Sequence, residues 1–252
     1  MTTSYWSGRQ PTVLLAAAAL YAVISIGLWR HQFVTEPVAG GVLRAFPAME
    51  LAAILCAPVA AHGLTSRMPA LDLTSPRPLR RRAIAAATSL MGAFAAVPLL
   101  ILAAVNLVPE LLPPGTFADV STEDRPLDAI YTPTMALSIA MGVALLCALA
   151  LLAVGLVGSV AGPVLYLALA GAIVMAQGTT SGSVIALSGA GDPPYEIHLW
   201  GALLAAAACS TATLVWSRTR AAAAPLSARL RHSRWLSTGI PSSAPTRASA
   251  NN

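Results

Sequence analysis

Six long apolar runs, almost free of charged residues, constrain this chain more than any other feature of its sequence. A helix needs about 20 consecutive apolar residues to cross a hydrocarbon core about 30 Å thick. Runs of about that length lie at residues 11–29, 45–64, 83–108, 133–157, 163–187 and 198–217. Only 10% of the residues are charged, against about 25% in an ordinary soluble domain. The sequence therefore predicts an all-α polytopic membrane protein, with six transmembrane helices in a domain covering residues 1–217.

The arginines orient these predicted helices. All 15 basic residues are arginine, and with both termini in the cytoplasm 12 of them lie on the cytoplasmic side. The other three, Arg30, Arg44 and Arg125, lie outside, where eight of the ten acidic residues also fall. Basic residues concentrate in cytoplasmic loops of membrane proteins. We therefore expect both termini to be cytoplasmic, in a multi-pass protein of a bacterial plasma membrane.

The composition excludes several classes of function. The chain has no lysine, so it has no phosphate-binding G-x-x-x-x-G-K-[ST] loop, and any ATP must be hydrolysed by another chain. Its three cysteines lie in apolar runs without C-x-x-C spacing, which predicts small buried side chains and no metal site. No cofactor is expected. The basic cytoplasmic rim favours anionic lipid as a partner over nucleic acid.

Catalysis is also disfavoured by the residues. Intramembrane serine proteases of the rhomboid kind have six helices, and they need a serine in a G-x-S-x setting and a histidine on the last helix. Here Thr179 stands two residues before Ser181, and Ala186 stands two before Ser188. His198 lies at the very edge of the sixth run. We therefore predict no enzyme activity and no catalytic residue.

The cytoplasmic link between the second and third runs mixes apolar residues with a terminal arginine cluster. Residues 67–82 end in Arg80, Arg81 and Arg82 and lead directly into the third run. Such a mixture is typical of a short element lying in the plane of the membrane interface. A plain basic flank that stops translocation explains the same residues, and the sequence leaves both interpretations open.

This region resembles the segment after the second helix of ABC transporter permeases of the type-2 exporter family. The resemblance rests on Ala57-Pro58 near the end of the second run, the Thr74-Ser75-Pro76 turn, the arginine cluster and the six-span layout of about 250 residues. It departs from the family where His62-Gly63-Leu64-Thr65-Ser66 replaces a glutamate followed by Gly-Thr. The resemblance implies a contact with a separate ATP-binding subunit through Leu71, Leu73, Thr74, Ser75, Pro76, Arg80, Arg81 and Arg82. It also implies a homodimer or heterodimer of permeases.

Polar residues interrupt the fifth run and suggest part of a transport pathway. They are Gln177, Thr179, Thr180 and Ser181. Non-helical backbone at membrane depth is tolerated where it lines a cavity or is buried in protein, and the type-2 permeases have short re-entrant helices at this point. A helix that ends near residue 177 and continues as an outer loop explains the sequence equally well.

Glu50 is an acidic residue about five positions inside the second run, and it is the other candidate for a pathway. Acidic residues in membrane spans are costly and are usually functional or paired. At this shallow depth a salt bridge to Arg30 or Arg44 is the interpretation that we favour over ion coupling.

Local signals complete the sequence-based description. Pro98, inside the third run, predicts a kink because proline removes a backbone hydrogen bond. Gly158 and Gly162 have the spacing that lets helices approach closely at a tight connection. Beyond the last run, residues 218–252 form a basic cytoplasmic tail, in which 225–236 predicts an amphipathic surface helix and the remainder is too polar to fold.

Together these features predict the membrane-spanning permease subunit of an ATP-driven transporter, an exporter by its resemblance. The alternative is a non-enzymatic membrane protein that acts as an accessory, immunity or sensor subunit. The two differ in one respect that can be measured, because only the permease requires an ATPase partner.

Overall fold

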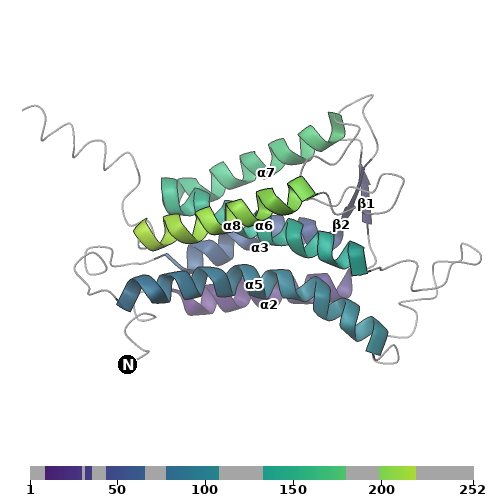
Figure 1. The fold of residues 1–252 in the computed structure, drawn as a ribbon, viewed down its shortest axis with the longest axis horizontal. Coiled ribbons are helices and arrows are strands. Elements are labelled where there is room, and N and C mark those ends of the chain that lie inside the picture. The colour runs from purple at the N-terminus through teal and green to yellow at the C-terminus, as the bar shows by residue number, and fades with distance from the viewer. Residues whose placement is uncertain are drawn as a thin grey trace, which may run out of the picture.

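The computed structural model describes residues 9–29, 32–35, 44–65, 78–107, 133–179 and 199–219. These residues form six helices and a two-stranded sheet, shown in Figure 1. The elements are α2 (Pro11–Gly27), β1 (Gln32–Thr35), β2 (Arg44–Pro47), α3 (Ala48–Gly63), α5 (Pro78–Leu107), α6 (Pro133–Val157), α7 (Ala161–Thr179) and α8 (Leu199–Thr219). Each helix coincides with one of the six apolar runs, so the predicted helical fold is confirmed.

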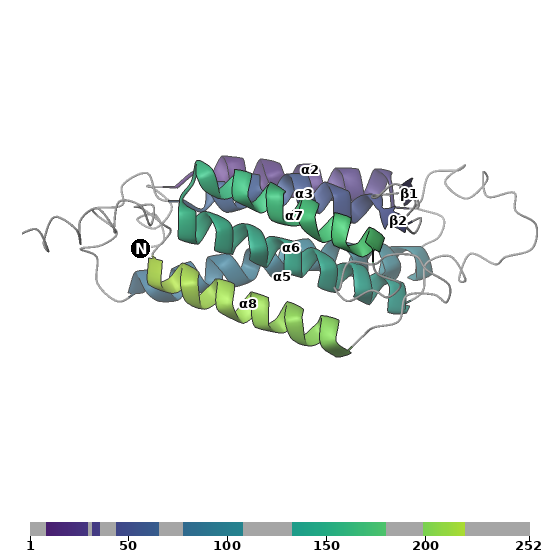
Figure 2. The same cartoon turned by 90° about the horizontal axis from the view of Figure 1, so that it is seen from above.

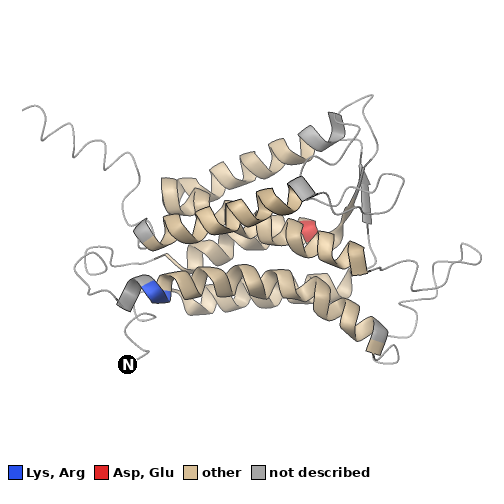
Figure 3. Cartoon of the chain, in the orientation of Figure 1, with Lys and Arg blue, Asp and Glu red and all other residues tan. Residues whose placement is uncertain are grey.

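The helices run along one axis and alternate in direction (Figures 1 and 2). The start of α2 and the end of α8 lie at one end of the bundle, and the β1–β2 sheet lies at the other. We call the first the arginine end, because Arg9, Arg81 and Arg82 belong to it, and the second the hairpin end. Figure 3 shows the two colours of charge toward opposite ends of the described bundle. Glu50 lies in the first turn of α3, which follows β2 directly and so belongs to the hairpin end.

Helix α6 is the centre of the bundle. It packs against α3, α5, α7 and α8, while α2 lies against α3 and α5. Sixteen of the 25 residues of α6 are buried, as expected for a helix surrounded by others. Many of the buried residues in α3 and α6 are alanine or glycine, and such small side chains allow helix backbones to approach closely.

The outside of the bundle is apolar. Among the described residues, twenty large hydrophobic side chains are exposed, and every one of the six helices contributes to them. Examples are Val164 on α7, exposed by 69%, and Leu100 on α5, exposed by 65%. Soluble monomers rarely expose apolar patches beyond a few hundred Å². Large apolar side chains exposed on every helix suit a surface that faces lipid.

Within the described part of the chain, two helical segments are long and apolar enough to cross a membrane, Arg81–Val105 and Pro133–Val157. The other four apolar helices there are shorter, with 15 to 17 residues in their apolar parts. Length and composition alone thus support membrane association.

The antiparallel sheet was not predicted from the sequence. Its register pairs Gln32 with Pro47 and Thr35 with Arg44. The predicted second span began at residue 45, which is wrong by three residues, because residues 44–47 are a paired strand and helix α3 begins at Ala48. Pro47 has the extended backbone of a helix N-cap, with φ −58° and ψ 137°.

Helix α5 also differs from its prediction at the start. The third span was expected from residue 83, but the helix already begins at Pro78. Proline is favoured in the first turn of a helix, where its missing N–H costs nothing. The arginine cluster at 80–82 therefore lies in the first turns of α5. Pro98 lies inside the same helix, which bends toward its C-terminal end (Figure 1), as the sequence predicted.

A tight turn joins α6 to α7, as the glycines predicted. Gly158 has a φ of 107°, a left-handed conformation that glycine adopts without strain. Its N–H donates a hydrogen bond to the carbonyl oxygen of Val154 over 3.0 Å. A Cβ on Gly162 would lie 2.5 Å from the Cα of Val154, so only glycine fits where the two helices meet.

Candidate functional site

The carbonyl groups at the end of α3 are capped by the residues that precede α2. A helix leaves its last four carbonyl groups without partners inside the helix. Here the backbone N–H of Gln10 donates to the carbonyl oxygen of Gly63 over 3.1 Å. The Nε–H of Arg9 donates to the carbonyl oxygen of Leu64, also over 3.1 Å. A guanidinium at a helix C-terminus is stabilised by the helix dipole as well.

This contact is tight enough to exclude a side chain at Gly63. A Cβ there would lie 2.8 Å from the backbone nitrogen of Leu14 and 3.2 Å from the carbonyl oxygen of Gln10. Arg9 is only 7% exposed. From the sequence, Arg9 was expected to be one of the cytoplasmic charges, whereas the structure gives it a buried structural contact that no local pattern signals.

His62 joins the same end of α3 to the α6–α7 turn. Its Nδ1 lies 3.3 Å from the carbonyl oxygen of Ser159, a hydrogen bond that the ring N–H donates because a carbonyl only accepts. The carbonyl oxygen of His62 itself accepts from the backbone N–H and the hydroxyl group of Thr65. The arginine end of α3 is thus held to α2 and to α6–α7 immediately before the link that leads to α5.

The predicted contact with an ATP-binding subunit falls mostly outside the described residues. Leu71, Leu73, Thr74, Ser75 and Pro76 are among those outside. The three arginines of the contact lie in α5, where Arg81 is exposed and Arg82 is half-buried. Helix α5 therefore carries one part of the predicted contact directly into the bundle.

Glu50 is buried near the hairpin end. It is the third residue of α3 and is 1% exposed, so it lies nearer to its helix end than the sequence predicted. A carboxylate in the first turn is stabilised by the positive end of the helix dipole. In a capping box, the side chain of the third helical residue accepts a hydrogen bond from the backbone N–H of the N-cap residue. The N-cap of α3 is Pro47, which has no N–H, so Glu50 cannot form this bond. The side chains of Arg30 and Arg44, its predicted partners, lie outside the described residues.

The polar residues of the fifth run are described in part. The backbone of α7 continues through Gln177 to Thr179, so these two belong to the helix. Thr180 and Ser181 lie outside the described residues, as does the stretch to residue 198. The choice between a re-entrant segment and an outer loop stays a prediction.

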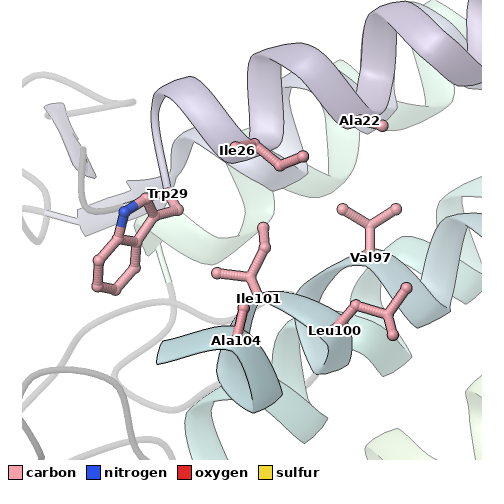
Figure 4. A pocket seen from close by; sticks show the side chains of 7 residues that line it. All are labelled: Ala22, Ile26, Trp29, Val97, Leu100, Ile101 and Ala104. Carbon is pink, nitrogen blue, oxygen red and sulfur yellow. The ribbon is translucent and has the colours of Figure 1, made fainter. Parts of the chain in front are cut away.

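A groove between α2 and α5 is a site that was not predicted from the sequence. Its volume is about 360 Å³, and Figure 4 shows it from close by. It is lined by apolar side chains and one indole: Ala22, Ile26, Trp29, Val97, Leu100, Ile101 and Ala104. In the sequence, Trp29 at the end of the first run and Pro98 in the third run were the available signals of such a site. Nothing in the sequence predicts that the helices formed by these two runs pack against each other.

Just beyond the groove, toward the arginine end, an aromatic stack joins α2 to α5. The rings of Tyr21 and Phe94 are 4.4 Å apart and nearly parallel, at 5°. Both side chains are 1% exposed, and they come one residue before Ala22 and three before Val97. Trp29 lies at the opposite end of the groove (Figure 4). Because β1 begins three residues after Trp29, that end is the hairpin end.

The cysteines do not form a site in the described part of the chain. Cys56 and Cys147 are buried and Cys209 is half-buried, all as free thiols, which confirms the prediction of buried side chains for two of them. Among the described residues, no group of three or more His, Cys, Asp or Glu side chains is placed to hold a metal ion.

Comparisons of the chain with protein-family models, with curated proteins and with solved structures found no match.

Proposed function

We propose that this protein is the membrane-spanning permease subunit of an ATP-driven transporter, working as an exporter. All six helices cross the membrane, both termini are cytoplasmic, and a separate subunit hydrolyses ATP. The protein belongs to a bacterial plasma membrane and works as a homodimer or heterodimer of permeases, with anionic lipid at its cytoplasmic face.

The apolar exterior supports the membrane placement. Exposed leucine and valine side chains occur on all six helices, and the ends of the helices gather at two opposite ends of the bundle (Figures 1 and 2). The arginine end is then cytoplasmic, because basic residues concentrate on that side. Four of the helices are short in their apolar part. Two of these parts, Pro11–Gly27 and Gly201–Ser217, have the 17 residues of the shortest spans, and α7 continues beyond its apolar part to Thr179.

One observation supports the coupling of transport to ATP hydrolysis: α5 is one continuous helix from the arginines of the predicted contact to the groove. Its 30 residues begin at Pro78 and extend about 45 Å at 1.5 Å per residue. The arginines of the contact lie in its first turns, and residues 97–104 line the groove near its other end. A push on the contact segment would thus move one wall of the groove.

The bend in α5 gives this movement a hinge. A proline inside a helix removes one hydrogen bond and weakens the helix locally, and Pro98 directly follows Val97, which lines the groove. The connection between α3 and α5 is anchored at its α3 end by the contacts of Arg9 and His62. A displacement of residues 67–82 is therefore transmitted through α5 and not through α3.

Two measurements test the proposal: whether an ATP-binding subunit co-purifies with the chain, and whether the chain stimulates ATP hydrolysis by that subunit. The tagged full chain is purified from its native membrane in mild detergent, and a stoichiometric ATP-binding subunit is expected to co-purify. In the isolated complex, replacing Leu71 and Leu73 by aspartate should abolish the stimulation of ATP hydrolysis while leaving membrane insertion unchanged.

The matched control replaces Leu226 and Leu230, in the predicted amphipathic tail segment, by aspartate. This pair adds the same two charges on the same side of the membrane, and it should leave stimulation intact. Stimulation that survives in the Leu71/Leu73 variant would refute the assigned contact. A chain that purifies alone, or with an unrelated membrane protein, would instead favour the accessory, immunity or sensor role.

A further inference from the structure

We infer that the groove between α2 and α5 binds one acyl chain of a phospholipid from the outer leaflet of the membrane. The inference rests on the membrane placement proposed above and not on the ATP-driven step. It assigns to the permease a substrate or regulatory ligand of amphiphilic lipid chemistry.

The groove is continuous with the apolar exterior of the bundle. Ile26 and Leu100, on its two walls, are 56% and 65% exposed, and they adjoin further exposed residues of the same helices, Val23 and Leu99. Lipid chains that cover the exterior therefore reach the groove without crossing any polar surface. The only polar atom on the side chains that line it is the indole nitrogen of Trp29.

The two ends of the groove match the two parts of a lipid. Tryptophan is enriched where the hydrocarbon meets the headgroups, so Trp29 marks that level at the hairpin end. From there the groove follows α5 from Ala104 to Val97, about 10 Å at 1.5 Å per residue. This length fits within one leaflet, half of a core about 30 Å thick. Beyond Val97, the Tyr21–Phe94 stack joins α2 to α5.

The groove suits an acyl chain because its walls belong to the apolar surface that lipid covers. Ile26 and Leu100 are exposed on its two sides, and its volume of about 360 Å³ extends over about 10 Å of α5. Occupation by a second copy of the chain is the alternative that the test below distinguishes.

The experiment uses the full chain in vesicles of phosphatidylethanolamine and phosphatidylglycerol. The probe is a phosphatidylglycerol that carries a photoactivatable diazirine in the middle of one acyl chain. After illumination, cross-linked residues are mapped by mass spectrometry. We expect labelling of α2 and α5 at the groove to exceed labelling of the exposed face of α8, around Leu203 and Leu204, by about fivefold, equivalent to about 1 kcal/mol.

Filling the groove should remove this excess. Ala22→Phe places a ring between the walls, and labelling of the groove should fall to the level at α8. Ala19→Phe adds the same ring to an exposed position of α2 outside the groove, and it should leave the excess unchanged. Ala104→Phe fills the groove from the opposite wall, which keeps the test decisive if the Ala22 variant does not fold.

Equal labelling at the groove and at α8 in the unaltered chain would overturn the inference, as would an excess that both filling variants leave intact. Cross-linking between two copies of the chain through the groove would assign the groove to a dimer interface and would overturn it too. None of these readouts involves an ATPase. A negative labelling result therefore leaves the co-purification result valid, and a negative co-purification result leaves the labelling result valid.

Discussion

Replacing Gly162 by alanine should destabilise the bundle more than the same replacement at Gly63, Gly92 or Gly171. An added Cβ would lie 2.5 Å from the Cα of Val154, 2.8 Å from its backbone nitrogen and 2.9 Å from the carbonyl oxygen of Ala153. Ordinary contacts of a Cβ lie at 3.4–4 Å, so α7 must move away from α6 by about 1 Å. All three obstructing atoms are backbone, and no side chain can rotate to make room.

The cost follows from the packing of α6. Overpacking a close-packed interior typically costs about 1–3 kcal/mol, and we expect the upper end, about 3 kcal/mol, because two backbones must separate. For a chain of this size each kcal/mol lowers the melting temperature by about 2–4 °C. The melting temperature of the variant should therefore fall by about 6–12 °C.

The buried cysteines provide the assay. A thiol-reactive dye labels Cys56 and Cys147 only when the bundle opens, because both are buried. The fluorescence gained during a temperature ramp in detergent, above the level given by the half-buried Cys209, therefore reports unfolding. The matched control is Gly171→Ala on the same helix, where a Cβ meets nothing within 4 Å. Alanine is a better helix former by about 0.5–1 kcal/mol, so this variant should melt slightly higher. Equal melting temperatures for the two variants would refute the reasoning.

Three further predictions concern the ends of the bundle. Gly63→Ala should lower the free energy of unfolding by about 2 kcal/mol, since its Cβ would lie 2.8 Å from the backbone nitrogen of Leu14. The control is Gly92→Ala, which has open space around it and should not destabilise the protein in the same melting assay. Arg9→Ala leaves the Leu64 carbonyl without its donor and should cost about 1–3 kcal/mol. In urea titrations in detergent the exposed Arg81→Ala should stay within about 0.5 kcal/mol of the unaltered protein. Alkaline phosphatase, which is active only outside the cytoplasm, should be active when fused within residues 109–132 and inactive within 66–77, and the opposite pattern would reverse the proposed orientation.

The sequence predicted the helices well because an apolar run of about 20 residues has few alternatives to a helix in lipid. The tight connection at Gly158 and the bend near Pro98 are local properties, and both were predicted correctly. Contacts between segments that are far apart in the sequence were not predicted. The hydrogen bond from Arg9 to Leu64 joins residues 55 positions apart, and the Tyr21–Phe94 stack joins two helices that are not consecutive in the chain. No local pattern encodes such contacts, because they depend on how the helices rotate against one another.

The candidate site was predicted least well, for a related reason. The groove has no charged or polar motif. Its residues are ordinary members of two apolar runs, and only the packing of α2 against α5 makes them a site. The strand at residues 44–47 was missed because Ala45 and Phe46 are as apolar as the helix that follows, and hydropathy alone does not separate a paired strand from the start of a span.

The capping of α3 by Arg9 and Gln10 also bears on how the protein is made. These contacts close the first two helices into a hairpin that is complete once residue 65 has been synthesised, and domains generally fold from the N-terminus during synthesis. Helices α2 and α3 can therefore pair with the carbonyl groups at the end of α3 already satisfied, before the central helix α6 exists. Arg9 and Gln10 thus do more than lead into a helix. A shortened chain that starts at Pro11 would form this pair with two carbonyl groups uncapped, and its biogenesis should suffer before its activity does.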